Sequence, residues 1–186
     1  MHPIIYSMSV SLDGFTAAPG DDISWTAPDA ELFRFHIEQT RGITAHLCGR
    51  RLYEAMLVWE TAEQTMSDEA ELEFARIWRP IPKVVFSRTL ESVEGNARLA
   101  TDDIATEITR LRDQPGEGAV GIGGADLAAA AIAEDLVDEY HQFVNPIILG
   151  GGTPYFPPLA RPLDLRLVES QIMGSRVVFL RYQRIR

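Results

Sequence analysis

The sequence predicts an α/β domain built on a largely parallel β-sheet. Short apolar runs alternate with longer amphipathic stretches along its 186 residues, as in chains of strand–helix units. Glycines directly follow two of the apolar runs, at Gly49 and at Gly123-Gly124, where a strand would turn into a helix. Two final runs, 165–171 and 176–184, flank Gly174-Ser175 and predict a closing antiparallel hairpin.

The first half of the chain supplies two predicted strands and three predicted helices. Asp13-Gly14 has the composition of a turn and would end the first strand. Pro28 suits the first turn of a helix, and Asp29 and Glu31 would complement the dipole there. The predicted elements are strands at 4–10 and 44–48, and helices at 28–40, from Gly49 to 56, and from Ser67 towards 78.

The second half continues the alternation. We expect Asp102 to cap a helix that extends to about residue 112, and an alanine-rich helix to span 125–133. Strands are predicted at 83–87, 97–99, 119–122 and 137–149, the last interrupted near Pro146 because proline cannot donate to a strand ladder. A glycine-rich loop follows at 150–154, and no linker or repeat divides the chain. We therefore expect one domain over 1–186.

Composition narrows the classes of partner. The formal net charge of −10 argues against general binding to nucleic acid or to an anionic membrane. Cys48 is the one cysteine, so no intramolecular disulfide can form. No apolar run approaches the ~20 residues of a membrane helix, and no signal peptide is visible. These features predict a cytoplasmic protein.

Three of the predicted strands end in residues that are suited to bind phosphate. At the first, Gly49 permits close backbone approach, and Arg50 and Arg51 place cations where the helix dipole disfavours them. A bound anion would explain them, and a solvated pair making surface ion contacts is an equal alternative. The second is Gly123-Gly124-Ala125-Asp126, an incomplete dinucleotide motif that a tight turn also explains.

The third is Ser87-Arg88, a hydroxyl and a guanidinium where a strand ends. That pair alone is typical of an ordinary strand end. Together the three junctions favour a dinucleotide with an extra phosphate, because Arg50 and Arg88 exceed the needs of a pyrophosphate.

The loops at 11–17 and 24–30 contain residue types that are typical of a pocket for a heterocyclic ligand. Asp13, Phe15 and Trp25 combine an acid with aromatic walls, although a turn and a core anchor are alternatives. His36 lies on the expected buried face of its helix, which favours a core histidine over a catalyst. His46 and His141 lack metal-ligand spacing with Cys48, so no metal is expected.

These motifs in series resemble a known family. Ser11-Leu12-Asp13-Gly14, Trp25-Thr26 and Pro28-Asp29-Ala30 resemble the reductase domain of the bifunctional deaminase–reductases of riboflavin biosynthesis, as do Gly123-Gly124-Ala125, 136–139 and 149–152. Gly49-Arg50-Arg51 with Tyr53-Glu54, and 84–88, are similar to the wider dihydrofolate reductase family. The resemblance implies a three-layer dihydrofolate-reductase-like fold with helices on both faces of the sheet, an NADPH site and a homodimer.

The resemblance also implies roles for individual residues. Arg50, Ser87 and Arg88 would bind the 2′-phosphate on the adenosine of NADPH, and the loop from Asp13 to Ala17 would lie near the nicotinamide and the substrate. Apart from the resemblance, if a side chain assists with proton transfer, we expect it to be Asp13. The remaining cofactor contacts would come from Ala17, Gly49, Arg51, Leu52, Gly123, Gly124, Ala125, Asp126 and Leu127, and the substrate contacts from Phe15, Trp25, Gly151, Gly152 and Thr153. For the last three, a place at the dimer interface is the alternative.

Two departures from the family pattern bear on the substrate. Ala30 stands where folate reductases carry a carboxylate, so folate is not expected. Phe15 stands where riboflavin reductases commonly carry a basic residue, which predicts a less charged, flatter ligand. We therefore expect hydride transfer from NADPH to a small pterin- or pyrimidine-like heterocycle. The alternative is an NADPH-binding module without turnover, which the cofactor motifs alone do not distinguish.

Overall fold

Eight strands form one mixed sheet at the centre of the protein. The computed structural model describes residues 1–174 and 176–186. The strand order is β5-β4-β3-β6-β1-β7-β10-β9, and only the pairs that β10 makes with β7 and β9 are antiparallel. The strands are β1 (Ile4–Ser11), β3 (Ile43–Gly49), β4 (Lys83–Phe86), β5 (Ala97–Leu99), β6 (Ala119–Gly123), β7 (Glu139–Asn145), β9 (Leu165–Met173) and β10 (Val177–Arg184).

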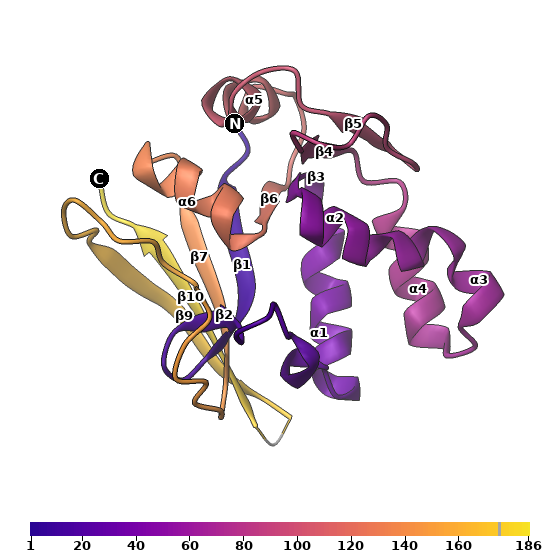
Figure 1. The fold of residues 1–186 in the computed structure, drawn as a ribbon, viewed down its shortest axis with the longest axis horizontal. Coiled ribbons are helices and arrows are strands. Elements are labelled where there is room, and N and C mark those ends of the chain that lie inside the picture. The colour runs from indigo at the N-terminus through magenta and orange to yellow at the C-terminus, as the bar shows by residue number, and fades with distance from the viewer. Residues whose placement is uncertain (175) are drawn as a thin grey trace.

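Helices cover both faces of the sheet (Figure 1). On one face, α1 (Ala30–Arg41) packs through Leu32 against β7 and β10, and through Ile37 against α4 (Glu69–Trp78). On the other face, α5 (Ile104–Arg112) and α6 (Ala125–Ala133) bury the main core with Tyr6 of β1. The predicted mostly parallel three-layer fold with a C-terminal hairpin is therefore confirmed. Short segments complete the chain: η1 (Ser24–Thr26), α2 (Arg50–Met56), η2 (Leu57–Thr61) and α3 (Ala62–Thr65).

The alternation of β1 assigns its side chains to different layers. Ile4, Tyr6 and Val10 are at most 2% exposed and belong to the core beneath α5 and α6. Residues at the intervening odd positions face α1 instead, because successive strand side chains point to opposite faces. This central strand therefore presents a different surface to each layer.

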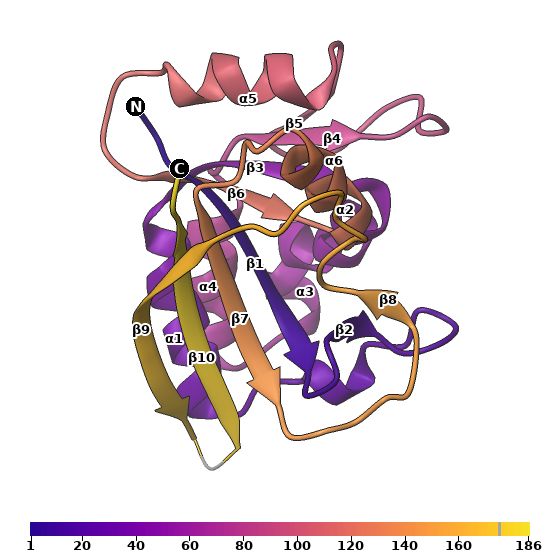
Figure 2. The same cartoon turned by 90° about the vertical axis from the view of Figure 1, so that its left-hand side faces the viewer.

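A two-stranded ribbon lies beside the carboxyl end of β1 (Figure 2). It pairs β2 (Phe15–Ala17) with β8 (Thr153–Pro154), which are far apart in the sequence. The sequence predicted only loops here, because each strand is too short to show periodicity.

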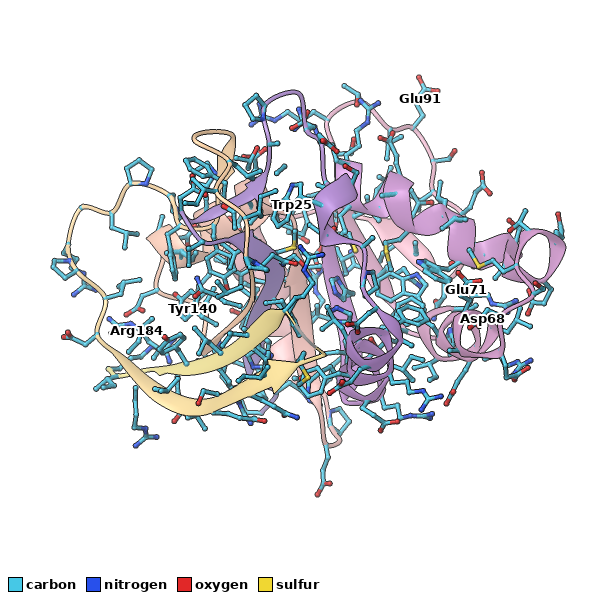
Figure 3. All side chains as sticks on the ribbon, turned by 90° about the horizontal axis from the view of Figure 1, so that it is seen from below. Trp25, Asp68, Glu71, Glu91, Tyr140 and Arg184 are labelled. Carbon is cyan, nitrogen blue, oxygen red and sulfur yellow. The ribbon has the colours of Figure 1, made fainter. Side chains whose placement is uncertain are left out.

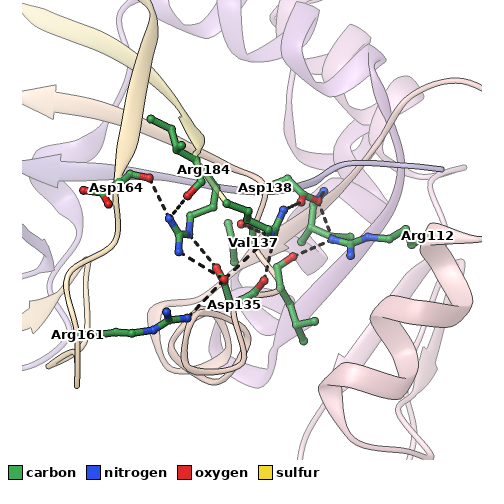
Figure 4. A network of polar contacts seen from close by, with 11 residues as sticks. Arg112, Asp135, Val137, Asp138, Arg161, Asp164 and Arg184 are labelled. Atoms are coloured by element: carbon green, nitrogen blue, oxygen red, sulfur yellow. Dashed lines mark hydrogen bonds and ion pairs between the residues drawn. The ribbon is translucent and has the colours of Figure 1, made fainter.

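An ion-pair network ties the opposite end of the sheet together (Figure 4). The Asp138 carboxylate accepts hydrogen bonds from the Ile4 backbone N–H at 2.8 Å, from Arg112 at 2.7 Å and from Arg186 at 2.7 Å. Asp135 accepts from Arg184 at 2.9 Å. These contacts join the first strand, α5 and the C-terminal strand at the amino ends of β1 and β7.

Some predicted boundaries were wrong. The strand expected at 137–149 spans only Glu139–Asn145, because the chain turns where Ile147 N–H donates to the Asn145 carbonyl. The helix expected from Pro28 begins at Ala30, with Asp29 as its N-cap. The cap of α5 is Asp103 rather than Asp102, which pairs with Arg110 instead.

Two further points concern particular segments. Of the turn predicted at Gly174-Ser175, Ser175 lies outside the described residues. Across the described ranges, no helix combines the length and apolar character that crossing a membrane requires.

Candidate functional site

A cavity of about 600 Å³ lies between α1 and the sheet. On the side of the sheet, β6 contributes two lining residues without side chains, Gly121 and Gly123. A β-carbon at Gly121 would lie 2.9 Å from the His46 ring, and one at Gly123 would lie 1.9 Å from Leu52. The lining includes Ser7, Ser9, Thr16, Ile23, Thr26, Phe33, His36, His46, Leu52, Trp59, Gly123, His141 and Phe143. Cavities of this size hold ligands of drug-like dimensions.

Two helix N-termini meet beside this cavity. Gly49 is the N-cap of α2, and Gly124, at φ 101°, is the N-cap of α6. A β-carbon at Gly124 would lie only 3.8 Å from the Gly49 Cα, so the two junctions adjoin. Neither N-cap has a side-chain hydrogen bond to the first turn, which leaves these amides available to an anion.

The structure brings Arg50 and Ser87 to one surface through Thr89. Arg50 donates to Glu54 at 2.8 Å and to the Thr89 hydroxyl at 2.7 Å. The Ser87 hydroxyl lies 3.5 Å from the same Thr89 oxygen. Ser87 and Arg88 also line a separate hollow of about 360 Å³. Thr89 was not predicted, although its position directly after Ser87-Arg88 was a signal.

Arg51 takes a different direction from Arg50. Its guanidinium donates to Asp21 at 2.8 Å, and its side chain is 74% exposed. This contact connects α2 to the loop that follows β2. Its predicted contact with a pyrophosphate would require the guanidinium to leave Asp21, and it stays a prediction.

Asp13 holds the glycine-rich loop against the end of β1. Its carboxylate accepts hydrogen bonds from the Ser11 hydroxyl at 2.7 Å, from Leu149 N–H at 3.1 Å and from Gly150 N–H at 2.7 Å. The Ser11 hydrogen bond, with the two backbone donors, lowers the pKa of Asp13 to about 2. A carboxyl group with that pKa remains ionised near neutral pH. The geometry therefore gives Asp13 a structural task, and its catalytic role stays a prediction.

The predicted substrate residues, Phe15, Trp25, Gly151, Gly152 and Thr153, are not among the residues that line the cavity. Phe15 and Ala17 are in β2, and the residue between them, Thr16, lines the cavity instead because strand side chains alternate. Trp25, labelled in Figure 3, lies in η1 before α1 and donates its indole N–H to the Asp22 carbonyl at 3.1 Å. Its neighbours Ile23 and Thr26 line the cavity. Gly151, Gly152 and Thr153 form and precede β8.

Two of the predicted cofactor residues line the cavity, and several others lie next to it. Leu52 and Gly123, each next to a helix N-terminus, line the cavity directly. Ala125, Asp126 and Leu127 occupy the first turn of α6, and a β-carbon at Gly49 would lie 3.9 Å from Leu127. The two phosphate junctions and the cavity are therefore contiguous.

Buried ionisable groups mark the inner part of the cavity. Burial lowers the pKa of both His36 and His46 to about 4, so both are neutral near pH 7. Burial raises the pKa of Glu139, but hydrogen bonds from His141 at 3.1 Å and Arg181 at 2.8 Å outweigh it and bring the pKa to about 2. Burial also raises the pKa of the Cys48 thiol to about 12.

Four cavity residues, Ser7, Ser9, Thr16 and His36, were not predicted as site residues. The signal for the serines was their spacing, because polar residues at every second position of an otherwise apolar central strand are unusual. Within residues 1–174 and 176–186, no group of three or more His, Cys, Asp or Glu side chains is arranged to hold a metal ion.

Comparison with known proteins gives a consistent result. Residues 3–179 match the family profile described as the RibD C-terminal domain. A Bacillus subtilis (strain 168) protein called uncharacterized protein YyaP is 29% identical over 181 residues, which cover 96% of this chain and 93% of that protein. A solved structure of a putative riboflavin biosynthesis protein from Shewanella sp. PV-4 has a TM-score of 0.76 at 23% identity, covering 100% of both chains.

Two more distant structures share the fold. One is a Thermotoga maritima diaminohydroxyphosphoribosylaminopyrimidine deaminase/5-amino-6-(5-phosphoribosylamino)uracil reductase, with a TM-score of 0.68 at 15% identity over 99% of this chain and 57% of that one. The other is dihydrofolate reductase from Enterococcus faecalis complexed with NADP(H) and RAB-propyl, with a TM-score of 0.59 at 14% identity over 98% and 96% of the two chains. These likenesses confirm the predicted dihydrofolate-reductase-like fold.

Proposed function

Because this chain belongs to the RibD C-terminal domain family, we propose that it is a reductase that transfers hydride from NADPH to a small pterin- or pyrimidine-like heterocycle. One observation carries the proposal: the 600 Å³ cavity reaches the point where the N-termini of α2 and α6 meet. Leu52 and Gly123 belong both to these junctions and to the cavity lining. A cofactor seated on the helix ends would therefore present its reactive ring to a ligand in the cavity.

The residues at the junctions fit NADPH. Gly124 has a φ of 101°, which side-chain-bearing residues rarely adopt, and Gly123 has no room for a β-carbon. Both features keep backbone amides close to the space where a pyrophosphate would lie. Arg50, Ser87 and Arg88 would hold the 2′-phosphate, aided by Thr89, which already bonds Arg50. The cofactor would supply the hydride, and the protein would supply orientation and electrostatics.

The cavity residues would orient the acceptor and exclude water. Thr16 and Thr26 add hydroxyls near the ribbon, and Phe33 and Trp59 add flat aromatic walls on the helical side. Asp13 would act by fixing the glycine-rich loop beside the ribbon, whose Thr16 lines the cavity. Such positioning can contribute much of the rate enhancement of an enzyme.

An NADPH-binding module without turnover is the second candidate. The helix N-termini would bind NADPH equally well in such a module. A sensor, however, has no need of the 600 Å³ cavity that lies next to these N-termini and could hold a second ligand. The existing cavity therefore favours the reductase.

A titration tests the cofactor assignment first. NADPH and NADH are added separately to the purified protein while the fluorescence of Trp59 and Trp78, which both line the cavity, is followed. Micromolar NADPH binding with about tenfold weaker NADH binding would support the assignment, since tenfold corresponds to about 1.4 kcal/mol. Equal binding of the two nucleotides, or no binding, would contradict it. Steady oxidation of NADPH with a pterin, pyrimidine or quinone would then exclude the module without turnover.

We further propose that the protein is a cytoplasmic homodimer. Ile172 of β9 and Val178 of β10 are cross-strand partners, and their side chains are 71% and 37% exposed. Val168 on the same edge strand is 47% exposed. Light scattering coupled to gel filtration would test this, with Ile172→Lys expected to convert a dimer to a monomer. A monomeric wild-type protein would refute the dimer.

A further inference from the structure

The deep part of the cavity is lined by polar groups that no predicted role uses. Ser7 and Ser9 face it from β1, and His36 faces it from α1. His141, Glu139 and Arg181 close it on the side of β7 and β10. We call these six residues the inner pocket. Ser7 and His141 are directly paired across β1 and β7, as are Ser9 and the cavity residue Phe143.

Three of these groups have hydrogen-bonding capacity to spare. Among the described residues, the Ser7 hydroxyl, the Ser9 hydroxyl and the His36 ring each lack an intramolecular hydrogen-bond partner. The next serine along the same face, Ser11, differs because it donates to Asp13 and accepts from Phe15 N–H. The His36 ring packs against Phe143, with 4.5 Å between the two ring centroids. Polar groups that line a cavity without a partner can bind a ligand at little desolvation cost.

The charged groups of the inner pocket neutralise one another. Arg181 donates from Nε and Nη2 to the two oxygens of Glu139, at 2.8 Å each, and His141 lies 3.1 Å from one of them. Among the described residues that line the cavity, Arg181 is the one arginine or lysine. A phosphate group at this end would therefore face a guanidinium that is already bidentate to a carboxylate.

His36 is the polar group that α1 contributes to the inner pocket, and its imidazole is neutral near pH 7. Near pH 7 an uncharged histidine ring offers one N–H donor and one nitrogen acceptor, and each serine hydroxyl likewise donates and accepts. This combination complements carbonyl, lactam or hydroxyl groups and provides no charge for an anion. The aromatic side chains of Phe33 and Phe143 also line the cavity and favour contact with a flat ring.

We propose that the inner pocket binds the uncharged, oxygen-bearing end of a flat ring compound, and that the substrate carries no phosphate in this position. The word substrate rests on the proposed reductase function. Binding of such a compound does not depend on the reductase function, because it requires only Ser7, Ser9, His36 and the ion-paired Glu139.

Equilibrium binding without cofactor tests the proposal. Calorimetry is performed with 2-naphthol, a flat two-ring compound with one hydroxyl group, and with 2-naphthyl phosphate, which has the same rings and a fixed negative charge. We expect 2-naphthol to bind at least about tenfold more tightly than the phosphate ester. Equal or tighter binding of the ester, or no binding of 2-naphthol, would overturn the proposal.

Variants locate the binding in the inner pocket. Ser7→Ala and His36→Phe should each weaken 2-naphthol binding by about three- to tenfold, as expected for the loss of one hydrogen bond. His36→Gln keeps a donor and an acceptor and should retain most of the affinity. Ser170→Ala, an exposed serine on β9 outside the cavity, is the matched control and should bind like the wild type. Unchanged affinity in both Ser7→Ala and His36→Phe would refute the assignment.

The outcome is independent of the cofactor. If NADPH fails to bind but 2-naphthol behaves as described, the reductase function is contradicted and the inner pocket stands. If NADPH binds, but 2-naphthol binds no more tightly than its phosphate ester and equally well to wild type and variants, the inner-pocket proposal is contradicted and the cofactor assignment stands.

Discussion

Gly152 lies so close to Ala17 that a β-carbon on the glycine would be 2.0 Å from the Ala17 carbonyl oxygen. The contact brings the glycine-rich loop onto the strand after the Asp13-Gly14 turn, where β2 pairs with β8. Gly152 also has a φ of 125°, in the region that favours glycine. The pairing of the glycine-rich loop with β2, whose Thr16 lines the cavity, therefore depends on one residue having no side chain.

Replacing Gly152 should open this ribbon. We expect Gly152→Ala to destabilise the protein by about 1–3 kcal/mol, because the φ is unfavourable and the carbonyl contact must be relieved. Gly151→Ala is the matched control, since a β-carbon on Gly151 would meet no atom within 4 Å and the residue has no positive φ. Urea denaturation of both variants measures the difference, and equal stability would contradict the packing argument.

The cofactor assignment makes a prediction about Arg50. Arg50→Ala should weaken NADPH binding by about tenfold or more and leave NADH binding unchanged, since only NADPH carries the 2′-phosphate. Arg76→Ala on α4 removes an exposed arginine that pairs with Glu69, and it serves as a control for lost surface charge. Fluorescence titration distinguishes the cases. NADPH binding that survives in Arg50→Ala would remove this residue from the phosphate site.

Asp13→Asn separates a structural role from a catalytic one. Its pKa of about 2 lies below the ordinary 3.8, so the stabilisation from its ionised form is present above about pH 4 and is lost as pH falls towards 2. Between pH 5 and 8 its protonation does not change. If it only fixes the loop, the variant should raise KM, leave kcat within about threefold and keep the shape of the pH–rate profile. A loss of kcat of about a hundredfold or more would instead support participation in proton transfer.

The buried histidines predict acid sensitivity. Burial lowers the pKa of His36 and His46 from 6.5 to about 4, so the unfolded chain binds protons first as pH falls. Their contribution to stability is therefore complete above about pH 6.5 and declines as pH falls towards 4. We expect a loss of about 1–2 kcal/mol per histidine at pH 5 relative to pH 7.

Urea midpoints at the two pH values test this prediction. His46→Gln should show a smaller drop between pH 7 and pH 5 than the wild type. Glu139, with its pKa near 2, titrates below this window and does not contribute to it. An identical drop in both proteins would assign the acid sensitivity to other groups.

The sequence predicted the elements whose signals are local. The strand before Gly49 and the strand before Gly123-Gly124 were both identified by an apolar run that ends in glycine, and both junctions lie at the same edge of the sheet. Confusing Asp102 with Asp103 as the cap had a local cause too, because adjacent aspartates give the same composition signal. The first predicted strand, at 4–10, differs from β1 by one residue.

The inner pocket could not be predicted in the same way. Its six residues come together only in the folded protein, because they lie on four elements, α1, β1, β7 and β10. Gly121 illustrates the difficulty, since in sequence it is only a glycine inside a strand. In the structure its missing side chain leaves room for the His46 ring, which would lie 2.9 Å from a β-carbon there. His36 was predicted as a core histidine, and its burial agrees, but no sequence signal showed that its ring faces a cavity.

The position of β1 between β6 and β7 has a consequence for synthesis of the chain. Ile4 and Ile5 pair with Val120 and Glu139, so β1 leaves the ribosome more than a hundred residues before its neighbours in the sheet. Contacts of such long range slow folding and leave apolar strand edges exposed while synthesis continues. We therefore expect β1 to remain an unpaired apolar strand on the ribosome until β6 and β7 have emerged.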